Sequence, residues 1–389
     1  MSTRLMASVR KRDDGRPKPW LVRWRDEAGA ERKKSFARKA DADRFRAEVE
    51  HSLNDGSYVD PKAGKITFQA YAEDWRAAQQ HRPNTAARKK SLLFKHVYPA
   101  IGGRQLTTIR HSTMQAFITG LSPALAPSSI ETVFRTVRSI YSAAKRDRLI
   151  KFDPCADITL PELPRVKVVP LTTGEVSALA AAVKPRYRAL VEFDAGTGLR
   201  QGEVFGVEVD DIDRTEKTLT VERQIQPAAG GGVVVCPLKN RHSYRTVPLG
   251  KAMFEVLDAH LAAYPPVAVE VLDVTGPKPV TRMARFVFVD DAGRPLNRNT
   301  FNESVWRPAR EQVGLPETTQ HDLRHFFASL LIRAGLNPKV VAERLGHRDA
   351  TLTLNTYSHL WPDDDDRSRQ AIDDVFGRDV PHMRPKEPK

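Results

Sequence analysis

The feature that most constrains the fold of this chain is a pair of boundaries rich in turn-forming residues and proline. Residues 54–65 (NDGSYVDPKAGK) are dense in turn formers, and residues 156–168 (ADITLPELPRVKV) contain two prolines. At 389 residues the chain is also too long for one ordinary hydrophobic core. The sequence therefore predicts a multidomain α+β protein in three parts.

The first part, residues 1–58, is predicted to be a small domain of three strands plus a helix. Trp20, Val22 and Trp24 alternate with Leu21, Arg23 and Arg25, as in a half-buried strand. A helix is expected over residues 39–51. Residues 1–40 hold 13 Lys and Arg against 5 Asp and Glu. This basic strand face is either a solvated surface or a DNA-binding surface that inserts into a groove, and we favour the second interpretation.

The parts that follow differ in their periodicity. Residues 66–152 are predicted to form four helices with interleaved basic residues, which suits a DNA clamp but also any solvated helical bundle. Residues 165–375 are predicted to form a mixed, mainly helical domain with a small antiparallel sheet. The polar residues 376–389 are expected to be a disordered tail.

The composition favours a polyanionic partner inside the cell. The 62 Lys and Arg against 48 Asp and Glu give a net charge of +14, and such proteins gain free energy by displacing counterions from nucleic acid. Cys155 and Cys236 are the only cysteines, too few for a disulfide framework or a four-thiolate zinc site. Since the sequence has neither an apolar run of ~20 residues nor a secretory signal, we expect a cytoplasmic protein without a membrane partner.

Two motifs of the third part carry cations that could contact a phosphate. Arg200 follows a Gly-rich turn and opens a helix, where it could bind an anion or simply pair with Glu203. Lys239 lies in a basic segment, residues 237–249, that is predicted to be a hairpin. The tip of this hairpin either reaches into a DNA groove or is only solvated.

A helix expected near residues 320–334 begins with HDLRH. His321 and Arg324 are three residues apart, so their side chains project from one face of its first turn. His321 and His325 have the spacing of two zinc ligands, but the HExxH pattern and a third ligand are missing, so we reject a metal site. The histidines could also simply cap and pack the start of the helix.

Two further candidates follow a helix expected over residues 338–345. Gly346 is suited to end that helix, and the turn would hold His347, although a lone histidine there is usually a surface residue. Tyr357 lies ten residues beyond His347. A free tyrosine hydroxyl is a poor nucleophile and needs cationic neighbours or a base, so Tyr357 taken alone is more often an ordinary amphipathic residue.

Together, the order and spacing of these motifs are similar to those of the tyrosine recombinase (phage integrase) family. Across residues 170–360 the chain has TGLRQGE, a lysine before a strand ending in RTVPL, HDLRH, LGH and TLNTYSHL in the family's order. Residues 66–152 resemble the helical core-binding domain of these enzymes. Residues 1–58 resemble the strand-rich arm-binding domain of integrases from phages and integrative elements.

The resemblance implies DNA cleavage and rejoining without a metal, another cofactor or ATP. Arg200 and Arg324 would bind the non-bridging oxygens of the scissile phosphate, and Glu203 would fix Arg200. His347 would donate a further hydrogen bond to that phosphate. Tyr357 would attack phosphorus in line, giving a 3′-phosphotyrosine and a free 5′-hydroxyl.

Two roles complete the implied catalytic set. Lys239 would protonate the leaving 5′-oxygen, and nearby Arg241 is the weaker choice because a guanidinium is a poor proton donor. His321 would act as a base or a positioner for the tyrosine. The implied catalytic residues are thus Arg200, Lys239, His321, Arg324, His347 and Tyr357.

The resemblance further implies that the protein integrates and excises a mobile element in a bacterial nucleoid. Its partners would be double-stranded DNA attachment sites and three further copies of itself, with the segment after Tyr357 packed on a neighbouring subunit. An excisionase and a DNA-bending protein are candidate accessory partners. The alternatives are relaxation of DNA in the manner of a type IB topoisomerase, and a regulator that reads DNA through residues 338–360 as a helix-turn-helix without cleaving it.

Overall fold

The structure, a computed structural model, describes most of the chain and divides it into two compact units. The described residues are 7–26, 29–55, 58–59, 63–164, 167–228, 230–361 and 365–376. The two units are residues 1–165 and 166–389, and each is considered by itself. The tail expected at residues 376–389 lies outside the described residues, apart from Phe376. Among the helices of the described ranges, none is long and apolar enough to cross a membrane.

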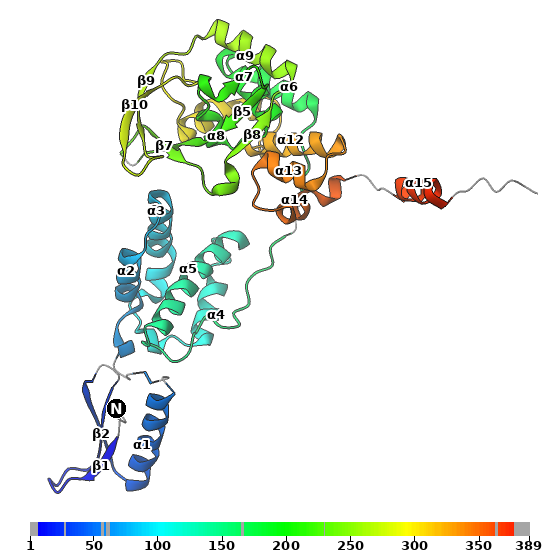
Figure 1. The fold of residues 1–389 in the computed structure, drawn as a ribbon. Coiled ribbons are helices and arrows are strands. Elements are labelled where there is room, and N and C mark those ends of the chain that lie inside the picture. The colour runs from blue at the N-terminus through cyan, green and yellow to red at the C-terminus, as the bar shows by residue number, and fades with distance from the viewer. Residues whose placement is uncertain are drawn as a thin grey trace, which may run out of the picture. The chain divides into compact units, whose positions relative to one another are not determined.

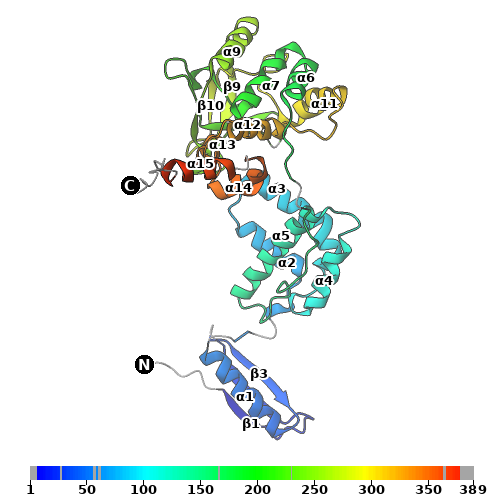
Figure 2. The same ribbon diagram turned by 90° about the vertical axis from the view of Figure 1, so that its right-hand side faces the viewer.

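The first unit begins with a three-stranded sheet covered by one helix (Figure 1). β1 (Ser8–Lys11), β2 (Trp20–Arg25) and β3 (Glu31–Phe36) pair antiparallel in that order. The helix α1 (Lys39–Asn54) lies along one face of the sheet, as Figure 2 shows. These are the elements expected from the alternation and spacing of apolar residues.

The alternation along β2 separates the two faces of this small sheet. Val22 and Trp24 are buried in the core against α1, and the Trp24 indole N–H donates to the hydroxyl of Tyr58 at 2.8 Å. Arg23 points the other way, is exposed, and lies in register with exposed Lys33 of β3. The sheet therefore has one apolar face that packs against α1, and an opposite, basic face that carries Arg23 and Lys33 beside buried Leu21.

The four helices expected in the next part of this unit are present. Their bounds, with those of the short helical turns between them, are η1 (Ala63–Lys65), α2 (Phe68–Ala78), α3 (Pro83–Leu92), η2 (Leu93–Gly102), η3 (Leu106–Thr108), α4 (His111–Gly120) and α5 (Pro127–Arg146). The second helix is longer than expected because α3 continues into the wider π-helix η2, which contains Pro99. Proline has no N–H to donate and its ring crowds the preceding turn, which disfavours regular α-helical bonding there.

The second unit is mainly helical, in agreement with the sequence. Its helices are α6 (Thr173–Ala182), α7 (Pro185–Thr197), α8 (Gln201–Phe205), α9 (Lys251–Ala263), α10 (Arg298–Phe301), η6 (Asn302–Trp306), α11 (Arg307–Gln312), α12 (His321–Arg333), α13 (Pro338–Leu345), α14 (Ala350–Tyr357) and α15 (Asp365–Phe376), with the short turns η4 (Val209–Asp211), η5 (Arg241–Ser243) and η7 (Ser358–Leu360). The buried helix α7 packs against α6, α9 and α12. It thereby forms the centre of the core from which the site is built.

Two sheets accompany these helices in the second unit. One is antiparallel, with strands β4 (Ile212–Asp213), β5 (Thr218–Val221) and β8 (Arg245–Pro248) in that order. The other has the order β10 (Val280–Ala284), β9 (Val269–Asp273), β7 (Val233–Pro237) and β6 (Arg223–Pro227). Its β7 and β9 strands pair in parallel.

Two predictions about these strands are therefore wrong. The expected single antiparallel sheet is two sheets, one of them mixed, because a parallel pair joins strands that β8 and α9 separate in the sequence. The expected hairpin over residues 237–249 is not a hairpin, because β7 and β8 belong to different sheets. The basic segment between them is instead a connection that passes from one sheet to the other.

Candidate active site

Arg200 stands on the turn that joins α7 to α8. Gly198 ends α7 with a left-handed φ of 60°, and a Cβ there would lie 2.3 Å from the ring of Phe327, so the turn requires glycine. The backbone N–H and the guanidinium of Arg200 both donate to the carboxylate of Glu203, at 3.1 and 2.7 Å. The pairing with Glu203 is therefore present, and it leaves about a third of the Arg200 side chain (34%) exposed.

Arg324 lies one turn into α12 and is only 1% exposed. Its guanidinium donates to the carbonyl of Gly198 at 2.7 Å and to the carbonyl of Leu345. Burial, followed by the nearby guanidiniums of Arg200 and Arg245, lowers the pKa of Arg324. Because two carbonyls hold a planar, delocalised cation, its orientation is fixed before any ligand arrives.

Three guanidiniums meet at the C-terminal end of α13; we call Arg200, Arg245 and Arg324 the arginine cluster. Arg245 Nε donates to the carbonyl of residue 344 at 2.8 Å, and Arg324 Nη2 donates to that of residue 345. Arg200 Nη2 donates to the carbonyl of residue 346 at 3.2 Å. The last carbonyls of a helix lack intrahelical partners and carry the negative end of its dipole. Three segments far apart in the sequence are thereby drawn to one point.

One buried carboxylate lies among these three cations. Glu203 accepts hydrogen bonds from Arg200 at 2.7 Å and from Arg245 Nη2 at 2.8 Å. Burial opposes its ionisation, but the charges of Arg245 and Arg200 outweigh burial and lower the pKa of Glu203. Three positive charges and one negative charge in a largely buried cluster favour a further anion, and a phosphate suits the donor geometry of guanidiniums.

His347 is held beside this cluster by the end of α13. Gly346 adopts a left-handed φ of 65°, and the His347 backbone N–H donates to the carbonyl of Ala342 at 2.9 Å. Its ring Nδ1 lies 2.8 Å from the hydroxyl oxygen of Thr353. Burial, then the charge of Arg324, lowers the pKa of His347 to about 3, so the ring is neutral at neutral pH and can offer one N–H.

Gly346→Ala is expected to lower the free energy of unfolding more than Gly335→Ala does. Both glycines have a left-handed φ, of 65° and 76°, and alanine in that region costs about 1–2 kcal/mol. A Cβ at Gly346 would also lie 3.1 Å from both Arg245 Nη1 and the His242 carbonyl, whereas a Cβ at Gly335 meets nothing within 4 Å. Urea unfolding of both variants measures the difference, and equal losses would contradict the tight fit at Gly346.

Tyr357 ends α14 with its side chain buried, 1% exposed. Its hydroxyl lies 2.7 Å from Nδ1 of His325. Burial raises the pKa of Tyr357 to about 12, although the charge of Arg324 acts to lower it. The resting hydroxyl is therefore protonated at neutral pH, and it would need a base to become a nucleophile.

From the sequence, His321 is expected to act as a base or a positioner for this tyrosine, but in the structure it is His325 whose ring nitrogen contacts the hydroxyl. The two histidines are four residues apart on α12, and their ring centroids lie 4.8 Å apart, edge to face. Burial, then the charges of His325 and Arg324, lowers the pKa of His321 to about 4. The ring of His321 therefore contacts that of His325, and His325 contacts the hydroxyl of Tyr357.

Lys239 lies on the segment that connects β7 to η5, and its side chain is exposed. This segment reaches the arginine cluster through its later residues, since Arg245 Nη1 donates to the carbonyl of Ser243 at 2.9 Å. The His242 carbonyl lies against Gly346. Lys239 thus lies on an exposed part of the connection that leads to Arg245.

Sequence reasoning missed two members of this arrangement. Arg245 belongs to the RTVPL segment, and its inward position on β8, beside buried Val247, was the available signal. His325 was considered as a zinc ligand, although its place one turn after His321 also puts it on the same face of α12. Within the described ranges, no group of three or more His, Cys, Asp or Glu side chains is placed to hold a metal ion.

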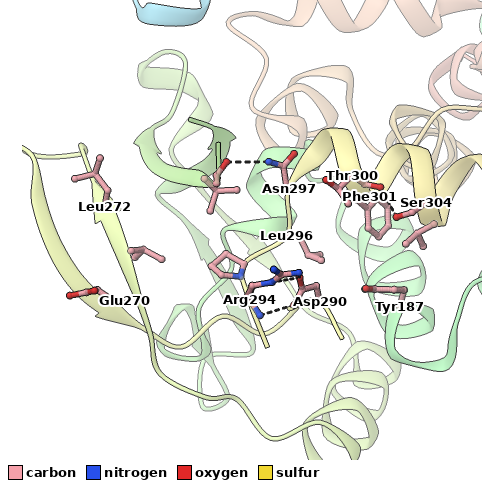
Figure 3. A pocket seen from close by; sticks show the side chains of 15 residues that line it. Tyr187, Glu270, Leu272, Asp290, Arg294, Leu296, Asn297, Thr300, Phe301 and Ser304 are labelled. Atoms are coloured by element: carbon pink, nitrogen blue, oxygen red, sulfur yellow. Dashed lines mark hydrogen bonds and ion pairs between the residues drawn. The ribbon is translucent and has the colours of Figure 1, made fainter. Parts of the chain in front are cut away.

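A separate pocket of about 440 Å³ lies elsewhere in the second unit (Figure 3). It is lined by residues of β7 and β9, the segment around Asp290 and Arg294, and helices near Phe301. Tyr187 and Ser304 also face it (Figure 3). None of the six predicted catalytic residues lines it, so the pocket is not the candidate active site.

Two family models match the chain. The model of the phage integrase family matches residues 170–363, and the model of the phage integrase N-terminal SAM-like domain matches residues 67–122. The chain belongs to the phage integrase family of tyrosine recombinases. Its function is accordingly site-specific DNA recombination, by cleavage and rejoining of DNA strands.

Curated relatives are similar over most of their length. The integrase of Mycobacterium phage L5 is 24% identical over 368 residues, which cover 91% of this chain and 94% of that protein. The ICEBs1 integrase of Bacillus subtilis is 23% identical over 299 residues, covering 76% of this chain and 79% of that protein.

Solved structures share the fold. The Tn1549 transposon integrase in complex with transposon right end DNA has a TM-score of 0.66 and is 20% identical, covering 80% of this chain and 100% of that one. A lambda integrase dimer bound to a COC′ core site has a TM-score of 0.56 and is 18% identical, covering 93% of this chain and 95% of that one.

Proposed function

We propose that the chain cleaves DNA with Tyr357 through a 3′-phosphotyrosine intermediate, and that it integrates and excises a mobile element at attachment sites on double-stranded DNA. The observation that supports this proposal best is the convergence of Arg200, Arg324 and the His347 turn at the end of α13, in a chain of the phage integrase family. The arginine cluster has an excess of buried positive charge, which a scissile phosphate would offset.

In the proposed mechanism, Arg200 and Arg324 hold the non-bridging oxygens of the phosphate. Both guanidiniums are already oriented by backbone carbonyls, so little reorganisation is needed as negative charge grows in the transition state. His347 donates a further hydrogen bond from its neutral ring. Tyr357 attacks phosphorus, the bond to the 5′-oxygen breaks, and the phosphotyrosine keeps the bond energy for rejoining, so neither ATP nor a metal enters the scheme.

Two further side chains are assigned the proton transfers of this mechanism, and a third positions one of them. His325, at 2.7 Å from the hydroxyl, takes the proton of Tyr357. His321 lies against the ring of His325 and sets its orientation. Lys239 protonates the leaving 5′-oxygen, for which an exposed ammonium on a loop tethered at Arg245 is suited.

A suicide substrate tests this proposal. A duplex carrying the attachment site and a nick beside the cleavage position loses a short fragment after cleavage, so the covalent adduct accumulates. The expected result is a protein–DNA adduct that survives denaturation, with its DNA on Tyr357 by peptide mapping. Failure to form any adduct on the element's own site would favour a regulator that only binds DNA.

His325→Phe is expected to slow adduct formation roughly 100-fold, since a positioned proton acceptor contributes about that much. The phenyl ring keeps the edge-to-face packing against Tyr357 but has no nitrogen within reach of the hydroxyl. Single-turnover kinetics on the suicide substrate measure the rate. His359→Phe is the matched control, because His359 bonds the carbonyl of Val168 instead. Equal rates for both variants would remove His325 from the mechanism.

Residues 1–58 are proposed to form a domain whose sheet binds a second class of DNA site, the arm-type site. Its basic face carries Arg23 and Lys33 side by side, with Arg10 on the neighbouring strand. The other face is occupied by α1, so the basic face is the one left for a partner. Base specificity would come from side chains of this face in a groove.

Arg23→Ala combined with Lys33→Ala is expected to weaken binding of arm-type DNA and to leave cleavage of the core site unchanged. Two lost phosphate contacts should reduce the slope of log affinity against log salt concentration by about 2. Fluorescence anisotropy at several salt concentrations measures this slope. Asp13→Ala combined with Asp14→Ala is the control, and an unchanged slope in the basic variant would argue against this face.

Residues 66–152 are proposed to form the core-binding domain. A hollow of about 580 Å³ on this helical part is lined by Lys89, Arg135, Arg138 and Arg146, together with Trp75. Lys89 Nζ lies 5.0 Å from the centroid of the Trp75 ring. Four cations around one hollow offer a contact surface for the phosphates of the core site.

Residues 165–375 are proposed to form the catalytic domain. The active assembly is proposed to be a homotetramer on DNA. The last helix, α15, exposes Ile372, Val375 and Phe376, at 57%, 69% and 77%. This apolar surface would pack on a neighbouring subunit. A lambda integrase tetramer has been solved on a Holliday junction. An excisionase and a DNA-bending protein are proposed accessory partners in the nucleoid, on the strength of the family resemblance.

A further inference from the structure

A buried polar pair, Asp194 and Gln320, lies next to the arginine cluster. Asp194 is in the last turn of α7 and is 1% exposed; Gln320 directly precedes α12 and is 4% exposed. Gln320 Nε2 donates to Asp194 Oδ2 at 2.7 Å. Within the described part of the chain, the other two oxygens of this pair, Asp194 Oδ1 and Gln320 Oε1, are buried without a hydrogen-bond partner.

These two orphaned oxygens belong to side chains that already share a hydrogen bond. An ionised carboxylate and an amide oxygen can only accept, and each buried acceptor without a donor costs about 1–3 kcal/mol. A proton on Asp194 Oδ1 removes both deficits at once, because the acid O–H then donates to Gln320 Oε1. The two side chains would be joined by two antiparallel hydrogen bonds, as a carboxylic acid joins a primary amide.

We infer that Asp194 is protonated in the folded protein and that the acid–amide pair with Gln320 positions α12 against the end of α7. Gly198 and Arg324, one turn away on either side, are joined by the hydrogen bond from the guanidinium to the carbonyl. The hydrogen-bonded pair of Asp194 and Gln320 is thus a second connection between the end of α7 and the start of α12. In the terms of the proposed function, on which this step rests, Asp194 is a positioning residue for the phosphate-binding arginines.

The surroundings of Asp194 favour the neutral acid. Burial is the largest influence and raises the pKa of Asp194 to about 8, while Gln320 and Arg324 on the α12 side act to lower it and Glu203 on α8 acts to raise it. The buried residues that α6 brings to the core are apolar, and α9 faces Gly196 with the thioether of Met253. Arg324, whose charge acts to lower this pKa, is already hydrogen-bonded to the carbonyls of Gly198 and Leu345.

Substitutions at this position separate a neutral acid from a buried charge. Asp194→Asn keeps one donor and one acceptor, so it can form an amide–amide pair with Gln320 and should retain most of the rate of adduct formation. Asp194→Leu has the same number of side-chain heavy atoms, branched in the same way, but no polar atoms, and we expect a loss of roughly 10- to 100-fold from a small displacement of Arg324. Glu192→Gln, a half-buried carboxyl on the same helix, is the matched control.

The pH dependence of folding tests the proton independently of any DNA chemistry. A carboxyl whose folded pKa is raised contributes stability that is complete below its unfolded pKa, near 4, and is lost as pH rises through its folded pKa. The melting temperature of the wild type should therefore fall relative to that of Asp194→Asn between about pH 4 and pH 8, and the difference should level off above that range.

Carboxyl-carbon NMR of the intact protein, labelled at aspartate, reads the same proton directly. The expected result is one resonance that titrates near pH 8 and is missing in Asp194→Asn. An Asp194 that is ionised at pH 6, or an Asp194→Asn variant as slow as Asp194→Leu, would overturn the inference. If the intact protein formed no adduct at all, the proposed function would fail, whereas the titration and the melting curves would still decide the state of Asp194.

Discussion

Tyr357→Phe is expected to form no covalent adduct on a suicide substrate, while still binding the same DNA. The substitution removes one oxygen from a side chain that is 1% exposed, so the packing against Phe327 and Leu345 is retained. Without the hydroxyl there is no atom to attack phosphorus, and removing a covalent nucleophile commonly costs on the order of 10⁶-fold in rate. Denaturing gels measure the adduct, and mobility shifts measure binding.

Tyr264→Phe is the matched control for this variant, because Tyr264 packs under Arg186 at the end of α9. It should form the adduct at the wild-type rate. Persistence of the adduct in Tyr357→Phe would assign the nucleophile to another residue. Loss of DNA binding along with the adduct would instead show that the substitution had disturbed the fold of α14.

Arg324→Lys is expected to slow adduct formation by about 10²–10³-fold, the loss typical when one donor to a transition-state oxyanion is removed. A lysine keeps the positive charge but is a point donor. Its single nitrogen cannot take the places of both guanidinium nitrogens that donate to the carbonyls of Gly198 and Leu345 and also face the phosphate. The variant should also be less stable, because at least one buried carbonyl loses its partner.

Arg333→Lys, the same exchange at the exposed end of α12, should change neither rate nor stability. Single-turnover kinetics and urea unfolding separate the two effects. If Arg324→Lys were as fast as the wild type but less stable, the guanidinium would serve only as a tie between α7, α12 and α13. A slow but stable variant would point to the phosphate contact alone.

Much of the site was predictable from local pattern. Gly346 ends α13 in the left-handed conformation that LGH indicates, and the TGLR turn needs glycine where Phe327 approaches. The helices that carry Arg324 and Tyr357 were also expected, because their apolar residues recur at helical spacing. Strand pairing was predicted less well, since the parallel partner of β7 lies beyond β8 and α9 in the chain.

What the sequence by itself determined is the identity and order of the residues proposed to bind the phosphate and to attack it, because their motifs are short and their spacing is set within single turns or helices. Only the tertiary structure decided which side chains meet. His325 and Tyr357 are 32 residues apart, and Asp194 and Gln320 are 126 apart. Such contacts depend on how helices pack, and one helical turn of difference moves the tyrosine's partner from His321 to His325.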